Sequence, residues 1–267
     1  EVFLVASNMM LKQMKPTARL HYQILDGGYA VNSIPDYARV LVRYRGDSAE
    51  NVTEYRNWLE DMAKGAGLAT KTKETFTVIT GTLDMVGNDP LAKNVYEHLK
   101  NHFPLKWTND EQAYAKAIQK EMGVPEIGMA DSITPMPTAS VEVGASSDVG
   151  DVSWNVPTMG VIYSSWPQGI SPHQWGCTAC NGMSIGHKAT IAAAKVLASS
   201  ALDLLTQPEL IEEAKEDFKK QTKGQPYKSI NELSEPPGGE LVPEDLRRFE
   251  CSIHAALEHF NIEHSEH

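Results

Sequence analysis

Three side chains able to bind a metal or carry a proton fall within residues 146–175 of this sequence. Asp148 and Asp151 lie three residues apart beside glycines, just ahead of an apolar run that predicts a strand. His173 follows in the loop Ser-Pro-His-Gln-Trp, where Pro172 restricts the backbone. Carboxylates and imidazole bind divalent metals, and imidazole is also the commonest general base. An acidic loop, a strand and a loop histidine therefore predict one part of a metal-dependent hydrolase site.

Each of these residues also has a plainer interpretation. Trp175 could pack against the ring of a functional His173, but His173 could also be a surface histidine that caps a strand end. Asp148 and Asp151 could orient a histidine or bind metal, but aspartate before glycine often forms an Asx-turn with its own backbone. His187 begins a helix, where the dipole favours the neutral imidazole and suits a hydrogen bond to a substrate anion. It could equally pack on its neighbours.

Two other features carry polar chemistry. Asn32 is an amide in the mostly apolar segment Gly-Gly-Tyr-Ala-Val-Asn-Ser-Ile-Pro-Asp, where it could bond the turn backbone or face a ligand. Cys177 and Cys180 have the spacing of a redox pair or of half a zinc knuckle. Because no second such pair exists and a strand is expected over 176–180, buried free thiols are the better interpretation.

The first third of the chain predicts the greater part of a small sandwich domain. We expect a helix ended by Pro16, a helix opened by an Asp47/Glu50 capping box and stopped by Gly65 and Gly67, and strands at 18–25, 38–44 and about 76–80. This order lacks only the first strand of a ferredoxin-like split βαβ sandwich. The simplest expectation is that the chain is the C-terminal part of something longer.

From about residue 82 the pattern changes to alternating helices and strands, which favours an α/β layer domain. Helices are expected over 90–103 and 109–122, from Ser184 as the cap, from Pro208, and near 243–259, with strands at 141–143 and 176–180. The helix after Ser184 is long and apolar. We expect its core face to be built from Ile191, Ala194, Leu197, Ala198, Ala201 and Leu205.

Composition narrows the class of protein. The chain has 267 residues, 41% hydrophobic, and a formal net charge of −11. This charge argues against nucleic acid and anionic membranes as partners, and no apolar run reaches the roughly 20 residues of a membrane span. Three cysteines do not form a disulfide framework, so a reducing compartment, the cytoplasm, is predicted.

Five segments together resemble the zinc-dependent aminoacylase and carboxypeptidase-G family of peptidases: GGYAVNSIPD, ASSDVGDVSWNVPT, SPHQW, GHKATIAAAKVL and ALDLLTQPELIEEAKEDF. The resemblance runs from about residue 1 to 237. It implies that residues 1–81 are a ferredoxin-like α+β lid and dimerisation domain without its first strand. Residues 82–235 would be the second half of a metallopeptidase-type α/β catalytic domain, followed by a polar tail at 236–267.

The resemblance also assigns roles to the candidate residues. His173 would be the one metal ligand of this chain, in a complete site for two divalent ions, zinc or manganese. Asn32 and His187 would bind substrate, while Asp148 and Asp151 would lie beside the site. The other ligands and the general-base glutamate are expected upstream of residue 1, so the chain alone need not bind metal.

The function implied is hydrolysis of the amide bond of a small N-acyl or N-aroyl amino acid by metal-activated water. p-Aminobenzoyl-glutamate is the first choice of substrate. The chain would be a C-terminal portion, inactive alone, that forms a homodimer through the lid and has a partner subunit. The alternative is a non-catalytic dimerising or binding module derived from the same fold. A thiol redox protein using Cys177 and Cys180 is a third, weaker hypothesis.

Overall fold

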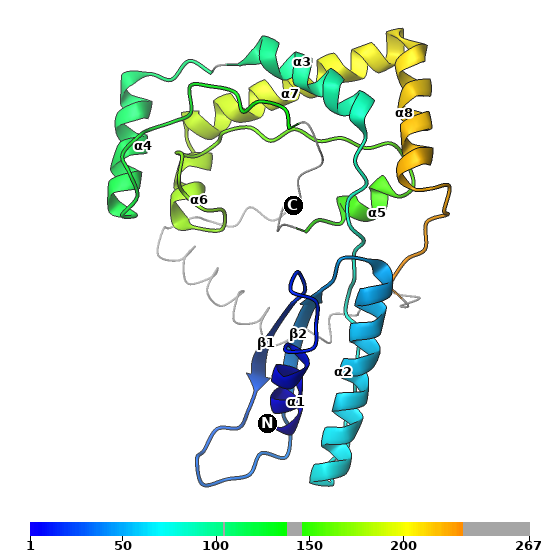
Figure 1. The fold of residues 1–267 in the computed structure, drawn as a ribbon. Helices are drawn as coiled ribbons and strands as arrows, with labels where there is room; N and C mark the ends of the chain where they lie inside the picture. The colour runs from blue at the N-terminus through cyan, green and yellow to red at the C-terminus, as the bar shows by residue number, and fades with distance from the viewer. Residues whose placement is uncertain (104, 138–145, 232–267) are drawn as a thin grey trace, which may run out of the picture. The chain divides into compact units, whose positions relative to one another are not determined.

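The computed structural model describes residues 1–103, 105–137 and 146–231, and its internal contacts divide the chain between Thr82 and Leu83 (Figure 1). The first unit comprises residues 1–82 together with 229–231, and the second comprises Leu83–Lys228. The strand expected at 141–143, the helix expected near 243–259 and the tail at 236–267 lie outside the described residues.

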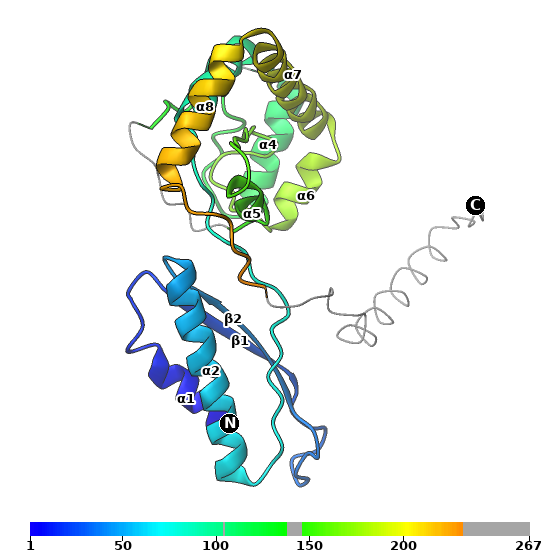
Figure 2. The same ribbon diagram turned by 90° about the vertical axis from the view of Figure 1, so that its right-hand side faces the viewer.

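The first unit is a two-stranded antiparallel sheet with two helices on one face (Figures 1 and 2). Its elements are α1 (Val2–Met10), β1 (Arg19–Asp26), β2 (Arg39–Arg45) and α2 (Ala49–Thr70). The two strands form as their alternating sequences predict, with Leu20 opposite Tyr44 and Tyr22 opposite Val42. Because an isolated hairpin is marginally stable in water, this sheet depends on a helix-covered core, made of Met10, Met14, Ala18, Leu20, Tyr55 and Leu59.

Both predicted limits of α2 were wrong. The N-cap is Ser48, not Asp47, and the Ser48 hydroxyl accepts a hydrogen bond from the Asn51 backbone N–H at 3.3 Å. Gly65 and Gly67 do not stop the helix, which ends beyond them at Lys71 in a left-handed conformation. Gly67 instead lies close to the residues that follow the helix. A Cβ there would meet the Glu74 carboxylate and, at 3.1 Å, the Thr72 carbonyl.

The strand expected around residues 76–80 does not form. A strand needs a neighbour for its backbone N–H and C=O groups, and within the described residues β1 and β2 pair only with each other. Phe76 packs against the core of the first unit, so its apolar character serves side-chain packing without a ladder. The apolar residues of this segment therefore indicated packing against the core, but they did not indicate a hydrogen-bonded strand.

The second unit is helical wherever the structure describes regular elements. These are α3 (Asp89–His102), α4 (Asn109–Glu121), α5 (Val149–Ser153), α6 (Trp175–Asn181), α7 (Ser184–Thr206) and α8 (Pro208–Gln221). α3, α7 and α8 pack against one another, and α6 packs against α4 and α7. Three of the predictions are confirmed here: α3, α4, and α8 with proline in its first turn, Glu209 early and Lys219 and Lys220 late.

Two strand predictions were wrong in this unit. Residues 176–180 belong to helix α6, and the run after Asp151 is irregular beyond the short helix α5. Short apolar runs do not distinguish a strand from a buried helix segment. Within α6, Gly176 lies so close to α4 that a Cβ there would collide with the Met122 side chain and press on that of Ile118 at 2.9 Å.

The predicted core face of α7 was also wrong. The buried side is formed by Ile185, Gly186, Ala189, Ala192, Val196 and Ser200, whereas Ile191 and Leu205 are 58% and 82% exposed. A helix with apolar residues on more than one side does not reveal from its sequence which side will be covered. Among the described helices, only α7 is long and apolar enough to cross a membrane, a property that core helices of soluble proteins share.

Candidate functional site

His173 lies in an exposed turn that is anchored at both ends. Before it, Ile170 is buried, and its carbonyl accepts a hydrogen bond from the Trp166 indole N–H at 3.1 Å. After it, the Cys177 N–H donates to the Gln174 carbonyl at 3.0 Å, and the Cys177 thiol donates to the Ser171 carbonyl at 3.3 Å. The imidazole therefore projects from a fixed backbone while remaining accessible to solvent.

The His173 backbone is left-handed, with φ of +66°. Non-glycine residues seldom adopt this conformation, and it persists only where the surrounding structure holds it. Such conformations cluster at functional sites, so the geometry adds an argument for His173 that the sequence could not supply. Trp175, expected to pack on the ring, is 55% exposed.

Asp148 and Asp151 bracket the first turn of the short helix α5. The Asp148 carboxylate lies 3.3 Å from the Ser147 hydroxyl, and Ser147 and Asp148 are both exposed. Asp151 accepts a hydrogen bond from the Tyr227 hydroxyl at 3.1 Å. This bond joins α5 to the segment after α8, which gives Asp151 a structural role whatever else it does.

His187 is exposed in the first turn of α7, and its backbone N–H donates to the Met183 carbonyl. Met183, not Ser184 as predicted, occupies the N-cap position. The Ser184 side chain instead donates to Oε1 of Glu111 at 2.6 Å. A hydroxyl that satisfies a buried carboxylate is not available to cap its own helix.

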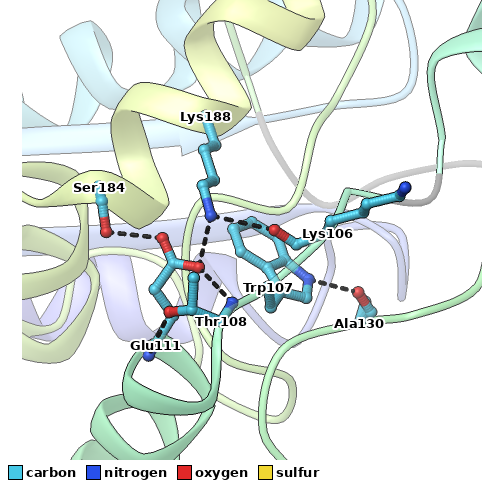
Figure 3. A network of polar contacts seen from close by, with 7 residues as sticks. All are labelled: Lys106, Trp107, Thr108, Glu111, Ala130, Ser184 and Lys188. Atoms are coloured by element: carbon cyan, nitrogen blue, oxygen red, sulfur yellow. Dashed lines mark hydrogen bonds and ion pairs between the residues drawn. The ribbon is translucent and has the colours of Figure 1, made fainter.

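Glu111 is the centre of a polar network that the sequence reasoning missed (Figure 3). Thr108 and Glu111 form a capping box at the start of α4, in which the Thr108 N–H donates to Oε2 of Glu111 at 2.7 Å. The Lys188 ammonium donates to the same oxygen at 2.6 Å and to the Lys106 carbonyl at 3.0 Å. The T-x-x-E spacing predicts the capping box, but nothing in it points to Lys188.

The electrostatics of Glu111 exclude it as a general base. Burial by itself would raise its pKa, but hydrogen bonds from Lys188, Ser184 and the Thr108 backbone outweigh this and lower the pKa to about 2. A carboxylate that is ionised at neutral pH and accepts three hydrogen bonds is a poor proton acceptor. Its role is to join the N-terminal turns of α4 and α7.

A second carboxylate joins α3 to α7. Oδ2 of Asp203 lies 2.6 Å from the Asn94 amide nitrogen and 2.6 Å from Nε2 of His98. The hydrogen bonds from His98 and Asn94 lower the pKa of Asp203. These three side chains bond to one another and thereby hold two helices together.

Cys177 and Cys180 are free and buried, as predicted. Burial raises the pKa of the Cys180 thiol, and the neighbouring Cys177 raises it further. A buried thiol with a raised pKa has little of the thiolate that redox chemistry requires. These observations weigh against the thiol redox hypothesis.

The structure does not gather the five candidate residues into one cluster. Asn32 lies in the first unit, in the exposed loop between β1 and β2. In the second unit, α6 separates His173 from His187 along the chain. Across the described ranges, no three His, Cys, Asp or Glu side chains are grouped to hold a metal ion. A catalytic zinc site needs about three protein ligands, so the described residues do not form one by themselves.

Comparison with known proteins gives three hydrolase relatives. The chain is 25% identical over 247 residues to a p-aminobenzoyl-glutamate hydrolase subunit of Escherichia coli (strain K12), covering 83% of this chain and 51% of that protein. It is 29% identical over 208 residues to Xaa-Arg dipeptidase of Homo sapiens, covering 78% and 42%. The Mus musculus Xaa-Arg dipeptidase is 27% identical over 212 residues, covering 79% and 43%. No protein-family model matches the sequence.

These relatives confirm the predicted resemblance to peptidases and amidohydrolases. The chain spans about half the length of the curated relatives it matches. Its mixture of helices with a small two-stranded sheet is compatible with part of a peptidase-type domain.

Proposed function

We propose that this homologue of amidohydrolases and dipeptidases takes part in hydrolysing the amide bond of an N-acyl or N-aroyl amino acid. His173 would supply one imidazole ligand to a divalent metal, zinc or manganese. The observation that carries the proposal is the left-handed, doubly anchored turn that presents His173 to solvent. A metal ligand must be held in a fixed direction, and this turn supplies that rigidity.

The proposal requires more ligands than the described residues contain. One histidine does not hold a catalytic metal, and Glu111 is unsuited to general-base chemistry because its oxygens are occupied. We expect the remaining ligands and the general base to come from polypeptide outside the described residues. The relatives are about twice the length of the matched region, which is consistent with that expectation.

The proposed architecture gives each unit a part in the reaction. The first unit would be a ferredoxin-like lid that also dimerises, and Asn32 on its exposed loop would donate a hydrogen bond to the substrate. Tyr29, Val31 and Ile34 on the same loop are almost fully exposed and could contact an aroyl group. The second unit would be half of a catalytic domain, presenting His173 and His187. One relative is named as one subunit of a hydrolase, which supports a partner subunit here.

The test is an activity assay on the protein purified from its native cells, so that any partner remains bound. Substrates are p-aminobenzoyl-glutamate and an Xaa-Arg dipeptide, assayed before and after chelation and after zinc or manganese is restored. We expect chelation to abolish hydrolysis and His173→Gln to lower it at least about tenfold. His21→Gln, which changes an exposed strand histidine in the first unit, is the matched control.

Full activity and full metal content in the His173→Gln protein would contradict the assigned role of His173. A protein that binds either substrate without turnover, with or without metal, would contradict the hydrolase proposal. That result would support the non-catalytic binding module instead.

A further inference from the structure

We propose that Cys177 is a positioning residue for His173, holding the turn at 171–174 in the conformation that presents the imidazole. The inference rests on the proposed role of His173 as a metal ligand. It gives a function to a cysteine whose spacing suggests redox chemistry and whose burial argues against it.

Cys177 contacts the turn on both sides of His173. Its thiol donates to the Ser171 carbonyl at 3.3 Å, two residues before the histidine. Its backbone N–H donates to the Gln174 carbonyl at 3.0 Å, directly after the histidine. Cys177 therefore binds the backbone on both sides of the left-handed residue His173. Of these two bonds, only the one from the thiol depends on the Cys177 side chain.

The anchor itself is packed in the core of the second unit. Cys177 is 6% exposed and belongs to the core cluster that includes Ala115, Ile118 and Ile170. The preceding residue, Gly176, brings α6 into close contact with Met122, the C-cap residue of α4. Because the Cys177 side chain is packed in the core, the hydrogen bond from its thiol holds the exposed turn at a fixed place relative to the core.

The energetic need for such an anchor is specific to His173. A histidine at φ of +66° is held against its own backbone preference, so the turn can relax when a bond to it is removed. Cys180 lies one helical turn further on, is fully buried in the same cluster, and makes no side-chain hydrogen bond within the described chain. It is thus a matched control, because its loss also costs packing but releases no part of the turn.

The test compares Cys177→Ala, Cys177→Ser and Cys180→Ala in the full 267-residue chain. NMR of histidine-labelled protein follows His173, identified by the signal lost in His173→Gln, and hydrogen exchange follows residues 170–178. We expect Cys177→Ala to shift the His173 signals and to speed exchange in the turn about fivefold, the effect of one ordinary hydrogen bond. Cys177→Ser, which keeps a donor, should restore both readouts, and Cys180→Ala should leave both unchanged.

Unchanged His173 signals in Cys177→Ala would overturn the proposal, as would equal effects of the two alanine variants or failure of serine to restore the signals. If Cys177→Ala does not fold, Cys177→Val fills the volume without a donor and takes its place in the comparison with Cys177→Ser. Neither readout needs metal or substrate. A negative activity assay would therefore leave the conclusion about Cys177 and the turn unchanged. A negative result for Cys177 would likewise leave the outcome of the activity assay unchanged.

Discussion

The Lys188 ammonium lies 2.6 Å from Oε2 of Glu111, and this partly buried contact joins two helices that begin 75 residues apart, at 109 and 184. The Glu111 side chain is 8% exposed and the Lys188 side chain 36%. Glu111 thus caps its own helix and anchors the N-terminal turn of α7, the turn that carries His187. A residue outside the proposed site thereby determines where one of its candidate members lies.

Removal of the Glu111 carboxylate should destabilise the protein. Glu111→Ala removes the capping box at the start of α4 and the charged acceptor shared by Lys188 and Ser184, at a cost of about 1–3 kcal/mol in the free energy of unfolding. Urea denaturation at pH 7 measures this loss. Glu212→Ala, which breaks the exposed Lys215–Glu212 pair, is the control and should cost less than about 1 kcal/mol. Equal losses in the two variants would show that the network contributes no more than a surface ion pair.

The Glu111 network should also make stability depend on acid pH. The pKa of Glu111 is about 2 in the folded protein and about 4.3 in an unfolded chain. Because the folded pKa is the lower one, the contribution is fully present above about pH 4.3 and is lost as the pH falls toward 2. The stability gap between wild type and Glu111→Ala, measured by urea denaturation between pH 7 and 2.5, should therefore narrow below about pH 4.3. A gap that stays constant or widens would contradict this assignment.

Gly176 and Gly182 should respond oppositely to the same substitution. Gly176→Ala places a methyl group against Met122 and Ile118 and should cost about 1–3 kcal/mol. Gly182, at the C-cap of α6, has open space around its Cα and a φ of −77°. Gly182→Ala should be neutral or stabilise by up to about 1 kcal/mol. Thermal unfolding compares the two, and a neutral Gly176→Ala would contradict close α4–α6 packing.

Two isoleucines on α7 test which side of the helix is covered. Ile185 is 1% exposed and Ile191 is 58% exposed. Ile185→Ala should cost about 2–5 kcal/mol by leaving a cavity, while Ile191→Ala should stay within about 0.5 kcal/mol. Chemical denaturation of the full chain measures both. A larger loss of stability in Ile191→Ala than in Ile185→Ala would instead show that the side of α7 carrying Ile191 is the buried one.

The left-handed turn at His173 shows where prediction of the candidate site stopped. Pro172 and the polar neighbours of His173 suffice to predict an exposed loop histidine. Its backbone conformation depends on Cys177, which is held in place because α6 packs on both α4 and α7. The T-x-x-E spacing at Thr108 likewise predicts a cap, but the partner of Glu111 lies 77 residues away in the sequence. Long-range pairs of this kind leave no local pattern.

The sequence by itself determined the features whose causes are local. Side-chain alternation produced the β1–β2 hairpin, and helical spacing with Pro208 and the charges at each end produced α8. Tertiary structure decided the rest. It made 176–180 a helix, left 76–80 without a strand partner, and selected which side of the largely apolar α7 is buried. The reason is physical: backbone pairing and burial depend on what lies across from a segment, and only the folded chain supplies that neighbour.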